Sequence, residues 1–104
     1  MKTIKTLGTS NEQTTCCCCG KSGLALTVVL EINGEVTYFG RDCAGAALTG
    51  KKSGTSAKIA SGRAAAVDFV NRNLGKATLE KVLAVAYNRF GYSVSLDGGK
   101  AVVA

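Results

Sequence analysis

Hydrophobic and polar residues alternate along residues 24–32, a period of two that is typical of a β-strand with one apolar face. The next two residues are Asn33-Gly34, and both types accept the positive φ angles of a type I′ turn. Residues 35–39 then return as a second strand. We therefore predict an antiparallel hairpin over residues 24–40. Its apolar face would be formed by Leu24, Leu26, Val28, Leu30 and Ile32.

A helical period replaces this alternation in the second half of the chain. Apolar residues recur every three or four positions over residues 57–74, and again between Thr78 and Gly91. Thr78 is a favourable N-cap, and Gly75 and Gly91 are typical of helix ends. The pattern thus predicts two amphipathic helices. Their buried stripes would be Ile59, Ala66, Val67, Val70 and Leu74 in the first, and Leu79, Val82, Leu83, Ala86 and Phe90 in the second.

Shorter elements complete the predicted fold. Small residues over 43–48 favour a short helix that Asp42 would cap and Gly50 would end. Residues 92–96 and 100–103 flank a turn and predict a second hairpin. The order of these elements is typical of an α+β protein.

We expect one domain over residues 1–104, because this length supports a single modest core. Residues 1–15 would form a short strand-like start and then a loose polar tail. Two halves would follow, a first half over residues 16–48 that contains all five cysteines and a helical half with its C-terminal hairpin over residues 57–104.

Five cysteines carry most of the potential chemistry of the chain. Four are consecutive, Cys16 to Cys19, and Gly20 follows them, while the fifth is Cys43. Two cysteines three positions apart in a tight turn bring their sulfur atoms toward one point, and zinc takes four ligands in a tetrahedron. The predicted hairpin is long enough to return Cys43 to that turn. Cys16, Cys19 and Cys43 are therefore the predicted zinc ligands.

The fourth zinc ligand stays open at this stage. The candidates are Asp42, Cys17, Cys18, a distant residue or water. If Cys16 and Cys19 face the metal, Cys17 and Cys18 should point away from it. Two other interpretations of the thiols are free cysteines in a small core, and redox or iron chemistry.

The cysteines and their neighbours resemble a known pattern. The sequence Cys16-x-Cys18-Cys19-Gly20-Lys21, followed by Tyr38-Phe39-Gly40-x-Asp42-Cys43-Ala44, is similar to that of small treble-clef-like zinc-finger proteins of bacteria and their phages. The resemblance covers residues 16–48 and implies a hairpin stapled by a metal. It implies no particular activity. A full treble clef would carry a further ligand near Ala46 or Ala47, and alanine cannot bind metal.

The charge of the chain points to an acidic partner. Thirteen Lys and Arg against seven Asp and Glu give a net charge of +6. No acidic residue occurs between Ala44 and Val67, so we expect partner binding through Lys51, Lys52, Lys58 and Arg63. Such a patch attracts nucleic acid or the acidic surface of a protein.

The composition also limits the cellular setting and the chemistry. The longest apolar stretch falls short of the 18 residues of a membrane span, and residues 1–7 lack the apolar block of a signal peptide. We therefore expect a cytoplasmic protein without a membrane partner, in the host cytoplasm if a phage encodes it. A reducing compartment favours metal binding over disulfides. The chain has no histidine and no close pair of carboxylates for acid–base work, so we expect no enzymatic activity.

Three functions fit these features. The first is a non-enzymatic, zinc-stapled binding module that acts as a small nucleic-acid-binding accessory protein. The second is a phage-type inhibitor of a host defence complex, of the anti-CRISPR kind, which would dock on a host nucleic-acid-binding protein. The third is a thiol redox protein.

Overall fold

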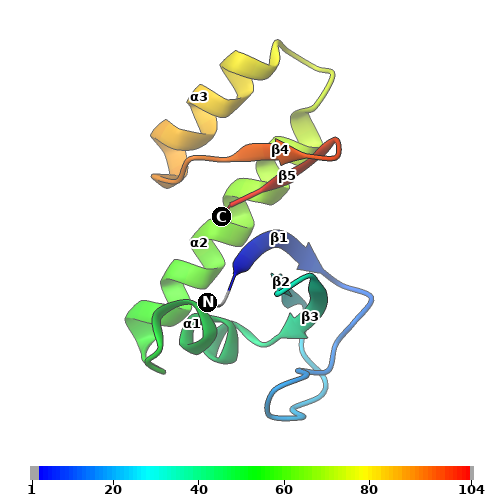
Figure 1. Ribbon diagram of the computed structural model, residues 1–104, viewed down its shortest axis with the longest axis vertical. Helices are drawn as coiled ribbons and strands as arrows, with labels where there is room; N and C mark the ends of the chain where they lie inside the picture. Colours follow the sequence, from blue (N-terminus) through cyan, green and yellow to red (C-terminus); the bar gives the residue numbers. More distant parts are fainter. Residues whose placement is uncertain (1–2, 104) are drawn as a thin grey trace.

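A computed structural model describes residues 3–103 of the chain, and its α+β architecture confirms the predicted fold class (Figure 1). Met1, Lys2 and Ala104 lie outside the described residues. The elements in chain order are β1 Ile4–Ser10, β2 Thr27–Ile32, β3 Glu35–Phe39, α1 Arg41–Thr49, α2 Gly54–Asn73, α3 Leu79–Phe90, β4 Ser95–Asp97 and β5 Lys100–Val102.

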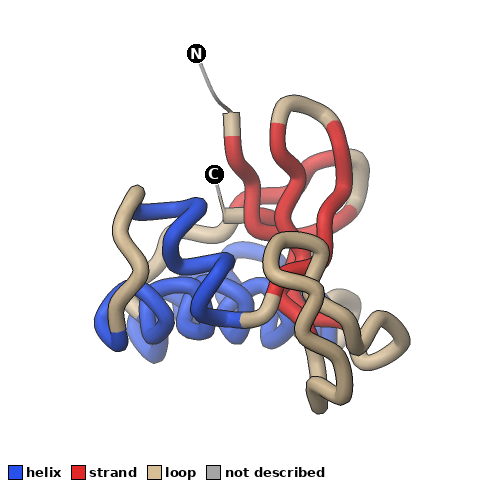
Figure 2. The backbone as a smooth tube through the Cα atoms, turned by 90° about the horizontal axis from the view of Figure 1, so that it is seen from below, coloured by secondary structure: helices blue, strands red, loops and turns tan. Residues whose placement is uncertain are grey.

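Helix α2 runs through the whole molecule and connects two cores (Figure 1). Near its N-terminal end it packs against α1 and the sheet β1-β2-β3, where Ala60 and Ala64 contact Val28 and Leu30. Near its C-terminal end it packs against α3 and the hairpin β4-β5. The helices gather on one side of the molecule, beside the strands (Figure 2). No helix in residues 3–103 is long and apolar enough to cross a lipid bilayer.

The first hairpin and its turn are confirmed. Strands β2 and β3 pair in antiparallel fashion from Val28–Phe39 to Ile32–Glu35. Asn33 and Gly34 have φ angles of 51° and 86°, the two positive values that a type I′ turn requires.

The start of β2 was predicted wrongly. The strand begins at Thr27, and Leu26 lies beyond it with 49% of its surface exposed. Strand β3 ends opposite Val28, so residues 24–26 have no partner there. The Leu24 N–H donates instead to the Thr14 carbonyl oxygen at 3.1 Å. Apolar positions 24 and 26 thus leave the sheet although they continue its alternation.

The predicted strand-like start is confirmed, but the strand continues through residues 8–10, which were predicted to belong to a loose polar tail. Residues 4–10 form β1, which pairs in antiparallel fashion with β2 across a bulge between Thr6 and Gly8. Thr6 also exchanges two backbone hydrogen bonds with Val103, at 2.7 and 3.1 Å. Pairing satisfies the edge of β2 that β3 leaves open, and it joins the N-terminal sheet to the C-terminal hairpin. Strand β2 is therefore the central strand, and its side chains at Thr27 and Val29 are buried as well as those at Val28 and Leu30.

The helix starts differ from expectation in two places. Helix α1 begins at Arg41 after Gly40, and no side chain caps it, so Asp42 lies in its first turn instead of serving as its cap. Helix α2 begins at Gly54, because Ser53 and Ser56 form a reciprocal capping box that extends the helix into the predicted basic loop.

The remaining helix signals agree with the structure. Gly50 and Gly91 end α1 and α3, and Thr78 caps α3 by accepting from the Lys81 N–H. The predicted stripes hold at their centres and loosen at their ends. Leu79, for example, is 42% exposed at the start of α3. The C-terminal hairpin is also confirmed, with strands shorter than predicted.

The turn at Gly34 gives a first test of the fold. A β-branched residue resists positive φ, so we expect Gly34→Val to destabilise the protein by about 1–2 kcal/mol. No atom outside the turn lies within 4 Å of the added Cβ, so the cost is conformational. Urea unfolding measures it, with Gly54→Val as the control, because Gly54 has open space and no positive φ. Equal midpoints for the two variants would contradict the assigned turn.

Candidate metal centre

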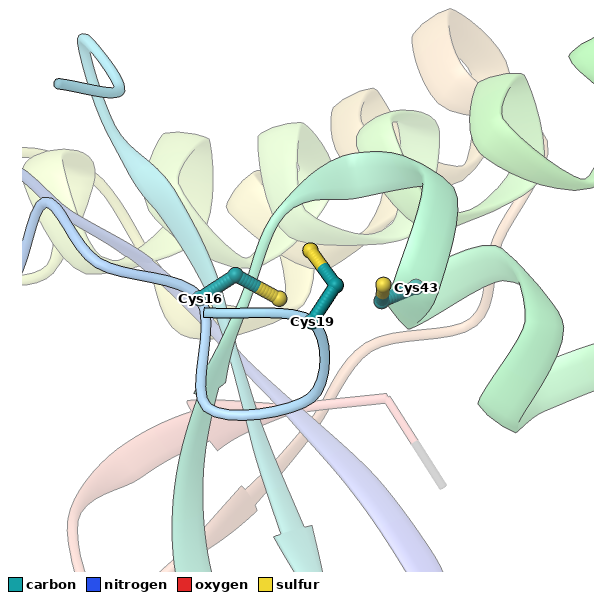
Figure 3. Close-up of side chains that lie close together, drawn as sticks. All are labelled: Cys16, Cys19 and Cys43. Carbon is teal, nitrogen blue, oxygen red and sulfur yellow. The ribbon is translucent and has the colours of Figure 1, made fainter. Parts of the chain in front are cut away.

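The structure brings three of the five cysteines together. The sulfur atoms of Cys16, Cys19 and Cys43 all lie within 4.8 Å of one another (Figure 3). In a zinc site with tetrahedral bonds of about 2.3 Å, the sulfur atoms are about 3.8 Å apart. The separations of the three thiols therefore exceed the spacing in such a site by at most about one ångström. Cys16 and Cys19 come from the turn before β2, and Cys43 comes from the first turn of α1.

Backbone hydrogen bonds build the turn that carries Cys16 and Cys19. The Gly20 N–H donates to the Cys16 carbonyl oxygen at 3.0 Å, and the Cys16 N–H donates to that of Lys21 at 2.9 Å. The Cys17 N–H donates to the Tyr38 carbonyl oxygen at 2.7 Å. The turn is thus closed by its own hydrogen bonds and is also bonded to β3 at Tyr38, three residues before α1 begins at Arg41. This tie explains why Cys43 returns beside it.

The Cys16 thiol has the surroundings of a metal ligand. Its residue is only 1% exposed, and this burial alone would raise its pKa. Backbone N–H groups of Cys19, Gly40 and Cys18 face the sulfur, and together with the Cys19 thiol they lower the pKa of Cys16 to about 7. Amides that face a sulfur favour its thiolate, the form that binds metal.

The Cys43 thiol shows the opposite shift. Burial, followed by hydrogen bonding with the Cys18, Cys16 and Cys19 thiols, raises its pKa to about 12. A second thiolate beside Cys16 is unfavourable because like charges repel in a buried site. A divalent cation removes that penalty by neutralising both thiolates. The cluster is therefore arranged to favour a cation and disfavours two bare thiolates.

Cys18 is exposed and lies outside the group of three sulfur atoms that are within 4.8 Å of one another. Its thiol is nevertheless close enough to Cys43 to contribute to the raised pKa of that thiol. Cys17 is exposed and does not belong to the group of three cysteines. Asp42 lines the adjoining cavity but does not belong to that group either. Of the candidates named for the fourth ligand, Cys18 is therefore the one whose thiol lies near Cys43.

Basic side chains border the cysteines. A cavity of about 300 Å³ next to the cluster is lined by Lys21, Arg41 and Lys52 as well as by the three cysteines. A neighbouring cavity of similar size contains Lys58 together with Arg41. Sequence reasoning named Lys52 and Lys58 but missed Lys21 and Arg41. Their positions next to Gly20 and Asp42, within the cysteine pattern, were the available signal.

Arg63 lies apart from the other predicted basic residues. It follows Lys58 by five positions, which turns it by about 140° around an α-helix. Its guanidinium lies over the Tyr92 ring, 5.7 Å from the centroid. Its Nε is buried without a hydrogen-bond partner among the described residues. Of the four residues predicted as one patch, Lys58 and Arg63 therefore lie on different faces of α2. Lys51 and Lys52 belong to the loop before the helix, where Lys51 is exposed.

No family model matches the chain, and no curated protein or solved structure does either. The resemblance to treble-clef-like zinc-finger proteins consequently stays a prediction that rests on residues 16–48.

Proposed function

We propose that this protein is a zinc-stapled module that binds nucleic acid through the basic surface around its cysteines. The observation that carries the proposal is the convergence of four cations on the cavity at the cluster and on the neighbouring cavity, both of which Asp42 also lines: Lys21, Arg41, Lys52 and Lys58. These cations come from four separate stretches of the chain. Within residues 3–103, the ion pair present is Lys5–Asp97, and it involves none of them. Their charge is therefore available to phosphate groups.

The metal would have a structural role in this proposal. Zinc suits the site because thiolates are its preferred sulfur ligands and because it brings no redox chemistry. Once bound by Cys16, Cys19 and Cys43, it would tie the cysteine turn to the start of α1. Lys21 and Arg41 lie two residues from Cys19 and Cys43, so the same tie would hold their backbones in place. Metal binding and the shape of the basic surface are then coupled.

The burial of two of the three cysteines supports a metal ligand role over thiol exchange. Cys16 and Cys43 are 1% and 6% exposed, whereas Cys19 is exposed. A thiol that attacks a disulfide needs access to it, whereas a metal ligand does not. Buried sulfur atoms that converge on one point are typical of a closed structural site.

Charge reversal of the loop before α2 tests the proposed partner. We expect Lys51→Glu with Lys52→Glu to weaken binding to random-sequence DNA of 20 nucleotides and to leave metal content and folding unchanged. Loss of two phosphate contacts should reduce the slope of log affinity against log salt by about 1.4 for single strands and about 1.8 for duplexes. Fluorescence anisotropy at several KCl concentrations measures both quantities.

The matched control reverses two lysines at the other end of the molecule. Lys76 and Lys81 are exposed and lie outside the cavities at the cysteines, so Lys76→Glu with Lys81→Glu makes the same change in net charge. Equal weakening by both double variants would mean that net charge alone governs binding. DNA affinity too weak to measure, with capture of a host protein that the Lys51 and Lys52 reversals abolish, would favour the inhibitor function instead.

A further inference from the structure

A groove runs between α2 and residues 24–26, the segment that precedes β2. Its cavity has a volume of about 520 Å³. One wall is α2, which contributes Ser61, Ala65, Asp68 and Arg72. These residues follow one another by four, three and four positions, so they lie on one face of the helix and span about 16 Å along its axis. The small side chains of Ser61 and Ala65 create the hollow.

The opposite wall of the groove is apolar and partly uncovered. It is formed by Leu24, Ala25 and Leu26, with Val28 deeper inside. Val28 belongs to the N-terminal core, whereas Leu26 remains 49% exposed at the rim. The apolar face of β2 thus continues beyond the strand onto a surface that no described element covers. The exposed rim leaves the groove open along one side.

Positive charges border this apolar surface. Arg72 lies on the last turns of α2, and Arg41 lines the groove together with Ser61, three helical turns away. Neither guanidinium forms an ion pair with any residue between 3 and 103. Asp68 also lines the groove and carries a negative charge, but it forms no ion pair with either guanidinium among residues 3–103. Its carboxylate accepts instead from the Thr9 N–H at 3.1 Å and from the Thr9 hydroxyl at 2.6 Å. The groove is therefore an apolar surface with one cation outside any ion pair toward each end, and with the hydrogen-bonded carboxylate of Asp68 one helical turn before Arg72.

We propose that this groove binds a short extended segment of a partner protein, with apolar residues at its centre and a carboxylate near each end. Charge complementarity with Arg41 and Arg72 sets the two acidic positions. A length of about 16 Å corresponds to about five residues of extended chain. The open rim suits a continuous chain that passes along the surface, whereas a pocket for a small molecule encloses most of its ligand. The inference does not depend on the nucleic-acid proposal.

An array of capped pentapeptides tests the groove. Each peptide has aspartate at both ends and Leu, Val, Phe or Ala at the three central positions, and the best binder is then titrated by fluorescence anisotropy against the full chain. We expect saturable binding, and at least about tenfold weaker binding when both aspartates are replaced by lysine. Absence of saturable binding to any acidic peptide, or equal binding of the lysine peptide, would overturn the proposal.

Two variants locate the binding in the groove. Ala65→Phe fills the hollow, and Arg72→Glu reverses one end, and each should weaken the acidic peptide by about tenfold or more. The controls are Ala84→Phe and Lys81→Glu, which place the same changes on exposed positions of α3. Arg41 is kept, because it also lines the cavities at the cysteines. If Ala65→Phe impairs folding, Arg72→Glu decides, and equal losses in Arg72→Glu and Lys81→Glu would refute the site.

Competition identifies the class of occupant. Decanedioate has two carboxylates joined by an apolar chain, and we expect it to displace the peptide only at far higher concentrations. Displacement by decanedioate at the peptide's own dissociation constant would assign the groove to a small amphipathic acid instead. The same competition is run with single-stranded DNA of 20 nucleotides on the double variant Lys51→Glu and Lys52→Glu. We expect the DNA to leave the peptide bound to this variant. Displacement of the peptide would overturn the peptide site and assign the groove to nucleic acid.

Discussion

The Cys43→Ser variant is expected to lose the bound metal and to unfold with a free energy lower by several kcal/mol, because metal binding is coupled to folding in small stapled domains. Cys43 is buried on α1, and its sulfur lies within 4.8 Å of those of Cys16 and Cys19, on the turn before β2. A hydroxyl is a poor replacement for a thiolate at zinc. Loss of the Cys43 thiolate therefore removes one metal ligand and, with it, the link between the cysteine turn and α1.

Elemental analysis and urea unfolding measure the two effects. The original protein should contain about one zinc per chain and lose stability with a chelator. Cys17→Ser should retain both properties, since Cys17 is exposed outside the cluster. The combined change of Cys17 and Cys18 to serine should reduce metal content less than Cys16→Ser does. A protein without metal whose stability is unaffected by Cys43→Ser would refute the site. Metal loss in the Cys17 and Cys18 variant alone would shift the ligand register.

Gly45→Ala is expected to destabilise the protein by about 2–3 kcal/mol or more, against the usual gain of about 1 kcal/mol for this change within a helix. Gly45 is buried where α1 crosses the start of α2. A Cβ at this position would lie 2.5 Å from the backbone C and O of Ser56 and 2.7 Å from the N of Ala57. Backbone atoms of a capped helix cannot move aside as a flexible side chain does, so the helices must separate.

Urea unfolding with Gly54→Ala as the control isolates the packing effect. Gly54 opens α2, has no positive φ, and has open space where a Cβ would be added, so its replacement should be neutral or slightly stabilising. Gly45→Ala should also weaken zinc binding, because α1 carries Cys43 two residues earlier. Stability equal to that of Gly54→Ala would show that α1 and α2 do not cross by backbone contact.

Local signals predicted most of the elements. Asn33-Gly34 places a turn by backbone preference alone, and a glycine after an apolar stripe ends a helix by the same kind of preference. These features depend on neighbours within a few residues, and the structure confirms them. The proximity of Cys16 and Cys19 to Cys43 was predictable for a similar reason. A hairpin of defined register brings its two ends together, and the cysteines flank the hairpin.

Sequence patterns gave less guidance where an element depends on which distant strand its backbone pairs with. The apolar alternation over residues 24–32 did not reveal that β3 ends opposite Val28, so it predicted a longer strand than the structure contains. The polar stretch after Gly8 likewise looked unstructured, although the open edge of β2 pairs with it. In each case the backbone groups that are available across the sheet decide the outcome, and they come from distant parts of the chain.

The amino-acid sequence by itself determined the α+β class, both hairpins, the helix ends and the three converging cysteines, because each follows from short-range conformational preferences or from one hairpin's closure. Only the tertiary structure decided which cations share a surface. Lys21 and Arg41 join Lys52 and Lys58 because the cysteine turn is tied to β3 beside α1, whereas helical rotation carries Arg63 away to Tyr92. Likewise, the groove between Leu26 and Arg72 exists because α2 packs past the segment before β2, which begins only at Thr27.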